Sequence, residues 1–183
     1  MRSIKSFMIV ILAALLIGPV DTMAEDLKIT AFKGNWRGNA VSESDASVNF
    51  PITSRDIDVR ITPKDGGDFE ITWRTLLRQK GTPGNPEETL KETTLLFTGE
   101  EGRSNFWRAA VAGDVFAGDP ISWAKLSKQT LTVYIMAISD AGDYDMQVYK
   151  RTLNGVNMEL EFTALRDGAV RRTANGRLVL DSY

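Results

Sequence analysis

The feature that most constrains the fold of this chain is a two-residue alternation of apolar and polar side chains over residues 156–164. One face carries Val156, Met158, Leu160, Phe162 and Ala164, and the residues between them are polar. A period of two is typical of a β-strand with one buried and one solvated face. Asn154-Gly155 precedes the run and Asp167-Gly168 follows it, and both dipeptides favour tight hairpin turns. Strands joined by such short turns must pair as antiparallel neighbours.

The same alternation and turn punctuation recur along most of the chain, and no stretch has a sustained helical period. Strands are expected at about 33–42, 56–62, 69–78, 89–98, 105–112, 121–126, 130–138, 144–153, 156–165 and 170–180. Residues 43–55 are expected to form a long loop. This pattern predicts an all-β fold, an antiparallel up-and-down β-barrel of about eight to ten strands. A small closed barrel either fills its interior with side chains or holds one ligand.

The first 24 residues have the form of a secretory signal peptide. Arg2 and Lys5 provide a positive start, an apolar run extends from Phe7 to Ile17, and Ala24 ends a small-residue cleavage site. The run is shorter than the roughly 20 residues that a membrane span needs. We therefore expect cleavage near Ala24, residues 25–183 as a single barrel domain, and a periplasmic or secreted mature protein.

The composition removes several kinds of chemistry. The chain has no histidine and no cysteine, so it lacks the usual general base, thiol nucleophiles and the commonest zinc ligands. Glu159 and Glu161 lie on a solvated strand face, while Asp140 and Asp143 flank glycine in a turn. We therefore expect no catalytic residue, no metal and no cofactor, and an enzyme is the least favoured class of function.

The charge pattern also narrows the choice of partners. The formal net charge is −2, which provides no basic patch for a nucleic acid. The polar strand faces carry many charged side chains, such as Arg74 and Glu161, whereas a membrane barrel needs a lipid-facing apolar band on every strand. We expect neither nucleic-acid binding nor membrane insertion.

Aromatic and methionine side chains provide candidate ligand contacts. Phe69 and Trp73 share one strand face, and Met146 and Met158 lie in adjacent strands on faces expected to point inward. These side chains either fill the barrel or line a cavity for a small apolar or aromatic molecule. The expected ligand-binding residues are Phe69, Trp73, Met146, Met158 and Phe162. A cavity of about 300 Å³ or more would favour ligand binding over a packed interior.

The expected strand within Leu131–Ile138 is apolar on both faces. One face must meet the core, and an outward apolar stripe is usually covered. The cover is either a second copy of the chain, which would make a homodimer through Leu131–Ile138, or the chain's own loop, residues 43–55.

Three short elements resemble the lipocalins and the wider calycin group that includes avidin-like barrels. Gly34-Asn35-Trp36 opens the first expected strand, Asp143-Tyr144 precedes the last two hairpin-linked strands, and Arg172 follows near the start of the final one. The resemblance implies a calycin-like barrel closed at one end by Gly34, Trp36 and Arg172, with the arginine stacked on the indole. The chain lacks the C-terminal helix and the disulfide that lipocalins often carry.

Two kinds of function remain open at this point. The first is an exported barrel that binds a small apolar molecule in its interior, as the resemblance to lipocalins implies. The second is a protein-binding barrel, such as a protease inhibitor or an envelope assembly factor, that uses the exposed loop at residues 82–86. The volume and lining of the barrel interior distinguish the two.

Overall fold

The computed structural model describes residues 26–45, 51–78, 88–111 and 113–182, and these residues form one closed antiparallel β-barrel. Its ten strands are β1 (Gly34–Ser44), β2 (Ile52–Pro63), β3 (Phe69–Arg78), β4 (Glu88–Glu100), β5 (Arg103–Ala109), β6 (Ile121–Ser127), β7 (Thr130–Ile138), β8 (Tyr144–Asn154), β9 (Asn157–Arg166) and β10 (Ala169–Ser182). Each strand pairs with its neighbours in sequence, and β1 pairs with β10 to close the barrel. The expected up-and-down barrel is therefore confirmed, with ten strands.

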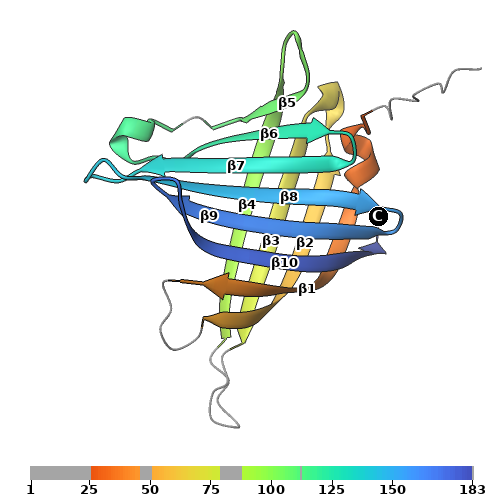
Figure 1. Ribbon diagram of the computed structural model, residues 1–183. Helices are drawn as coiled ribbons and strands as arrows, with labels where there is room; N and C mark the ends of the chain where they lie inside the picture. The colour runs from red at the N-terminus through yellow and green to blue at the C-terminus, as the bar shows by residue number, and fades with distance from the viewer. Residues whose placement is uncertain (1–25, 46–50, 79–87, 112, 183) are drawn as a thin grey trace, which may run out of the picture.

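The barrel is built as two groups of strands that cross. In Figure 1, β7–β10 run across the view at the front, while β2–β5 pass behind them at a steep angle. Short turns close the β8–β9 and β9–β10 hairpins near the expected Asn-Gly and Asp-Gly dipeptides, and Gly155 and Gly168 both have positive φ, at 62° and 77°. The first turn lies at Gly155-Val156, one residue later than expected, because Asn154 pairs with Asn157.

One strand boundary differs from the expectation. Residues 43–55 were expected to be a loop, but β1 extends to Ser44 and β2 begins at Ile52, with Glu43 paired to Ile52. Ladder hydrogen bonds come from the backbone, so polar side chains at the rim of a barrel do not prevent pairing. Part of this segment, residues 46–50, lies outside the described residues.

In the described part of the chain, helical structure is limited to three 3₁₀ segments, η1 (Ile29–Phe32), η2 (Asp65–Gly67) and η3 (Val115–Ala117). Over the described residues, no helix has the length and hydropathy that crossing a bilayer would need.

The barrel is packed solid at the end near η1, which we call the closed end. Phe69 stacks on Phe97 with 5.0 Å between ring centroids, and the edge of Trp107 meets Phe69 at 5.2 Å. Phe32 of η1 is fully buried and its carbonyl oxygen accepts a hydrogen bond from Trp36 Nε1 at 3.0 Å. The short N-terminal segment thus covers one end of the barrel, and Trp36 anchors it.

The glycine of the Gly-x-Trp element has a clear steric reason. Gly34 has φ of +136°, and a Cβ there would lie 2.5 Å from Leu180 Cδ1 and 2.9 Å from the Ser182 carbonyl oxygen. Only glycine fits this backbone conformation and this close approach of β10. Gly34 therefore brings the chain into the barrel, and Trp36, which is 3% exposed, fills the core behind it.

Candidate ligand-binding site

A cavity of about 300 Å³ lies inside the barrel, between the closed end and the opposite end, which we call the loop end. Its volume is at the lower limit of typical ligand cavities. It is lined by Ser42, Arg55, Ile57, Val59, Trp73, Thr75, Lys91, Thr93, Gln147, Tyr149, Arg151, Leu160, Phe162, Arg172 and Ala174. These residues come from β1–β4 and β8–β10, so both crossing groups of strands contribute to the wall.

Three aromatic rings form one wall of the cavity. Trp73 of β3 and Tyr149 of β8 lie with ring centroids 4.9 Å apart, and Phe162 of β9 lies 4.7 Å from Tyr149. Tyr149 and Phe162 are direct partners in the ladder between β8 and β9, so their side chains share the inner face. The wall offers a flat apolar surface to an aromatic or aliphatic group.

The side chain of Arg151 is the most unusual feature of the site. It is fully buried, and none of its three guanidinium nitrogens has a hydrogen-bond partner in the described part of the chain. Its guanidinium carbon lies 5.2 Å from the ring centroid of Trp73 and 5.4 Å from that of Tyr149. The aromatic wall therefore supports the cation by cation–π contacts but supplies none of the acceptors that its N–H groups need.

Other cations lie nearer the loop end. Arg55, Lys91 and Arg172 line the same cavity, so four cationic side chains face it and no Asp or Glu does among its described lining residues. The Nε atoms of Arg55 and Arg172 are also buried without a hydrogen-bond partner among the described residues. Among the residues that the structure describes in the cavity wall, no carboxylate balances this positive charge.

Burial and neighbouring charges shift the pKa values of three side chains in the cavity wall. Burial lowers the pKa of Arg151 to about 10. Burial also lowers the pKa of Arg55, and the charge of Arg172 lowers it further. Burial raises the pKa of Tyr149, against the opposing charges of Arg151 and Arg172. The Tyr149 hydroxyl donates to Gln147 Oε1 at 2.7 Å. At neutral pH the site therefore holds cationic arginines beside an uncharged tyrosine.

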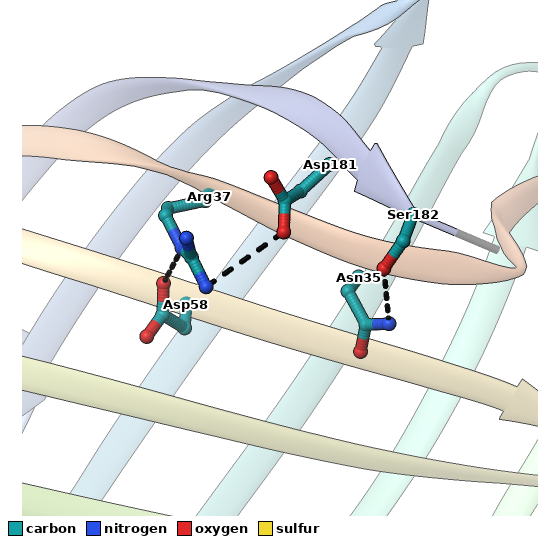
Figure 2. Close-up of polar contacts among 5 residues, drawn as sticks. All are labelled: Asn35, Arg37, Asp58, Asp181 and Ser182. Carbon is teal, nitrogen blue, oxygen red and sulfur yellow. Dashed lines mark hydrogen bonds and ion pairs between the residues drawn. The ribbon is translucent and has the colours of Figure 1, made fainter.

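Cations on the outer face are in a different situation. Figure 2 shows Arg37 of β1 between Asp58 of β2 and Asp181 of β10, at 3.1 Å and 3.7 Å. Asn35 donates to the Ser182 hydroxyl at 2.9 Å beside them (Figure 2). This cluster borders a surface hollow of about 260 Å³, where Arg37, Asp58, Arg74 and Asp181 are already in ion pairs. Further outward pairs are Lys64–Glu70, Arg74–Glu92, Arg108–Glu100, Lys150–Glu161 and Arg166–Asp145. The inner arginines differ because some of their nitrogens are buried and have no partner among the described residues.

The structure brings together two of the five expected ligand-binding residues. Trp73 and Phe162 line the cavity. Phe69 and Met158 are fully buried in the closed-end core and line no part of it. The expected inward direction of Met146 is wrong, because it alternates with Gln147, Tyr149 and Arg151, which face the cavity.

The expected contact between Trp36 and Arg172 is also wrong. Because β10 runs antiparallel to β1, Trp36 is paired with Leu180, and Arg172 is paired with Ser44 eight residues farther along β1. At ~3.3 Å a residue the two side chains lie about 26 Å apart along the strands. Gly34 and Trp36 belong to the closed end, and Arg172 belongs to the cavity.

Sequence reasoning did not single out Arg151, Tyr149 or Arg55. On β8 the outward residues Met146 and Val148 are more apolar than the inward Gln147 and Arg151, so polarity alone predicts the wrong face of this strand to be inside the barrel. The pattern of the neighbouring strand β9 would have predicted the correct face. Phe162 and Leu160 lie on the clear apolar face of β9, and the hairpin in which Asn154 pairs with Asn157 places Tyr149 and Arg151 opposite them.

The apolar strand β7 uses its two faces differently. Leu131 and Val133 are fully buried in the core, while Tyr134 on the opposite face stacks on Trp123 of β6 at 4.9 Å. In the segment 43–55, Asp45 lies beside β10, since its backbone N donates to the Arg171 carbonyl oxygen, and the described residues from Ile52 onward pair with β1. The homodimer through Leu131–Ile138 stays a prediction.

Comparisons with known proteins add little to this description. No family model matches the sequence, and no curated protein matches it. The chain is similar in structure to the S-type phycobiliprotein lyase CPES from Guillardia theta, with 10% sequence identity and a TM-score of 0.40, over 86% of this chain and 94% of that one. A likeness this distant carries no argument about ligand or activity, so the function must be argued from the cavity.

Proposed function

We propose that the protein is an exported binding barrel that holds one small molecule with an aromatic or apolar body in its interior. The observation that supports this proposal is the cavity of about 300 Å³ walled by Trp73, Tyr149 and Phe162. A barrel needing only stability would fill this space, as the closed end does, because empty space forfeits packing energy. The loop at residues 82–86, which a protein-binding barrel would use, lies outside the described residues.

Export is part of the proposal and rests on the sequence of residues 1–24, which also lie outside the described residues. The periplasm, or the medium after secretion, is the proposed location.

The test is a titration with N-phenyl-1-naphthylamine, an uncharged fluorescent dye with aromatic rings. Binding next to Trp73 should quench tryptophan fluorescence and raise the dye's emission, and it should raise the melting temperature. A Trp73→Phe variant should lose most of the quenching. A Trp123→Phe variant is the matched control, because Trp123 stacks on Tyr134 on the outer face. Neither quenching nor thermal stabilisation, with this dye or with other apolar ligands, would contradict interior binding and favour the protein-binding alternative.

A further inference from the structure

Buried charge without a partner is rare, because removing an ion from water costs several kcal/mol. Buried arginines are therefore paired or hydrogen-bonded in most proteins. Arg151 is fully buried, all three of its guanidinium nitrogens lack partners among the described residues, and the residue is one of those that line the cavity. Its guanidinium contacts the ring faces of Trp73 and Tyr149.

A purely structural role explains this arrangement poorly. Cation–π contacts with two rings offset part of the desolvation cost, but they leave every N–H donor unpaired. A methionine or leucine at this position would fill the same space next to Leu160 without a desolvated charge. The outer face shows that the chain has carboxylates to pair with arginine where pairing is the purpose, as at Arg37.

Resting on the proposed function, we propose that the ligand is an amphiphilic organic acid whose anionic head group is held by the Arg151 guanidinium. The planar fork of an arginine binds a carboxylate or sulfonate with two parallel hydrogen bonds. Trp73, Tyr149 and Phe162 then contact the apolar body of the molecule.

The other cations of the cavity fit the same ligand class. Arg172 lies close enough to Tyr149 to influence its pKa, and it also lies close enough to Arg55 to lower the pKa of that side chain. Like charges held close together without a carboxylate between them repel each other, and a bound anion relieves this repulsion. Arg151 supplies the buried contact, while Arg55, Lys91 and Arg172 make the approach from the loop end electropositive.

The test compares two probes that differ in a single group. 1-Anilinonaphthalene-8-sulfonate carries a sulfonate, whereas N-phenyl-1-naphthylamine has the same rings without it. A hydrogen-bonded charge pair of this kind should make the sulfonate dye bind the purified protein about 10- to 100-fold more tightly. In competition, decanoate should displace the dye far better than decanol, and inorganic phosphate, which has no apolar body, should not displace it.

Substitutions then assign the preference to one side chain. Arg151→Met should remove the 10- to 100-fold preference while leaving the affinity for N-phenyl-1-naphthylamine within a few-fold, which also shows that the cavity is still folded. Arg151→Lys should retain part of the preference, because the charge stays and the planar fork is lost. Arg37→Met is the matched control, since its guanidinium lies on the outer face with carboxylate partners.

The outcomes separate this inference from the proposed function. Equal affinity of the two dyes, or an unchanged preference in Arg151→Met, would overturn the anion proposal and leave interior binding intact. Binding of neither dye would overturn both.

Discussion

At the scale of single residues, adjacent positions on one strand can differ greatly in their contribution to stability. Trp36 is 3% exposed in the closed-end core, whereas the side chain of its neighbour Arg37 is 66% exposed on the outer face. Trp36→Ala should lower the free energy of unfolding by about 3–5 kcal/mol, as truncation of a buried indole does. Arg37→Ala should lower it by about 0–1 kcal/mol, because exposed ion pairs contribute little. Urea denaturation of both variants measures the difference, and similar losses would contradict the assignment of Trp36 to the core.

A second residue-scale prediction concerns the cost of the buried arginine in the ligand-free protein. Arg151→Met should raise the free energy of unfolding by about 1–4 kcal/mol, because an apolar side chain of similar volume removes a desolvated charge. Arg151→Lys should give no such gain. Urea denaturation without ligand measures the effect, and destabilisation by Arg151→Met would show that the arginine stabilises the barrel itself.

The pKa of Arg151 predicts how the increase in unfolding free energy caused by Arg151→Met depends on pH. Burial lowers the folded-state pKa of Arg151 to about 10, below its ordinary value, so the penalty for burying its charge is fully present below pH 10 and is relieved as pH rises above it. Tyr149 acts in the opposite direction at high pH, because its raised pKa makes the folded state resist ionisation. The gain from Arg151→Met should therefore be constant between pH 6 and 9, which unfolding curves across that range would check. A gain that changes steeply within it would contradict this assignment.

At the scale of elements, the contact of β1 with β10 decides whether the barrel closes. A Cβ on Gly38 would lie 2.1 Å from the Arg177 carbonyl oxygen and 2.9 Å from the Leu178 Cα, so the two backbones approach too closely for any side chain. Gly38→Ala should force these strands apart and cost roughly 1–3 kcal/mol, the range for overpacked sites.

Hydrogen exchange measures this effect directly, since amides of β1 and β10 should lose protection in Gly38→Ala while those of β7 and β8 keep theirs. Gly99 of β4 offers the matched control. Its added Cβ would meet no heavy atom closer than 3.8 Å, so Gly99→Ala should leave β1 and β10 protected. Full protection of β1 and β10 in Gly38→Ala would contradict the close approach.

At the scale of the whole molecule, positive charge is concentrated inside a chain that is acidic overall. The formal net charge is −2, yet four cations face the cavity. The field of the cavity therefore favours anions even though the average charge does not. The formal net charge of the chain therefore does not predict the positive charge of its cavity.

The export proposal also belongs to the whole molecule. Expression of the full chain in a Gram-negative host should yield a periplasmic product that begins at Glu25, because the basic start, the apolar run and Ala24 match a signal peptide. Mass spectrometry of the purified protein measures the mass. An Ala24→Glu variant should remain uncleaved, since the cleavage site requires a small residue. Recovery of intact protein starting at Met1 from the cytosol would contradict export.

The alternation of apolar side chains was sufficient to predict the strand number and the antiparallel order. On β9 and β3 the alternating apolar residues Met158, Leu160, Phe69, Ile71 and Trp73 are buried, so the period of two predicts their direction correctly. The turn between β8 and β9 lies at Gly155-Val156, one residue later than expected. Trp73 and Phe162 were predicted in the site for the same reason. These features depend on local physics, namely strand periodicity and turn conformation.

The tertiary structure alone decided where polar residues point and which residues meet. The inner face of β8 carries Gln147, Tyr149 and Arg151, so on this strand the face inside the barrel is more polar than the outer face. Arg172 meets the loop end because the first and last strands pair antiparallel in a register that no local pattern specifies. Local alternation determines the strands of this chain, whereas the closure of the barrel determines its binding site, because the site is assembled from strands far apart in sequence.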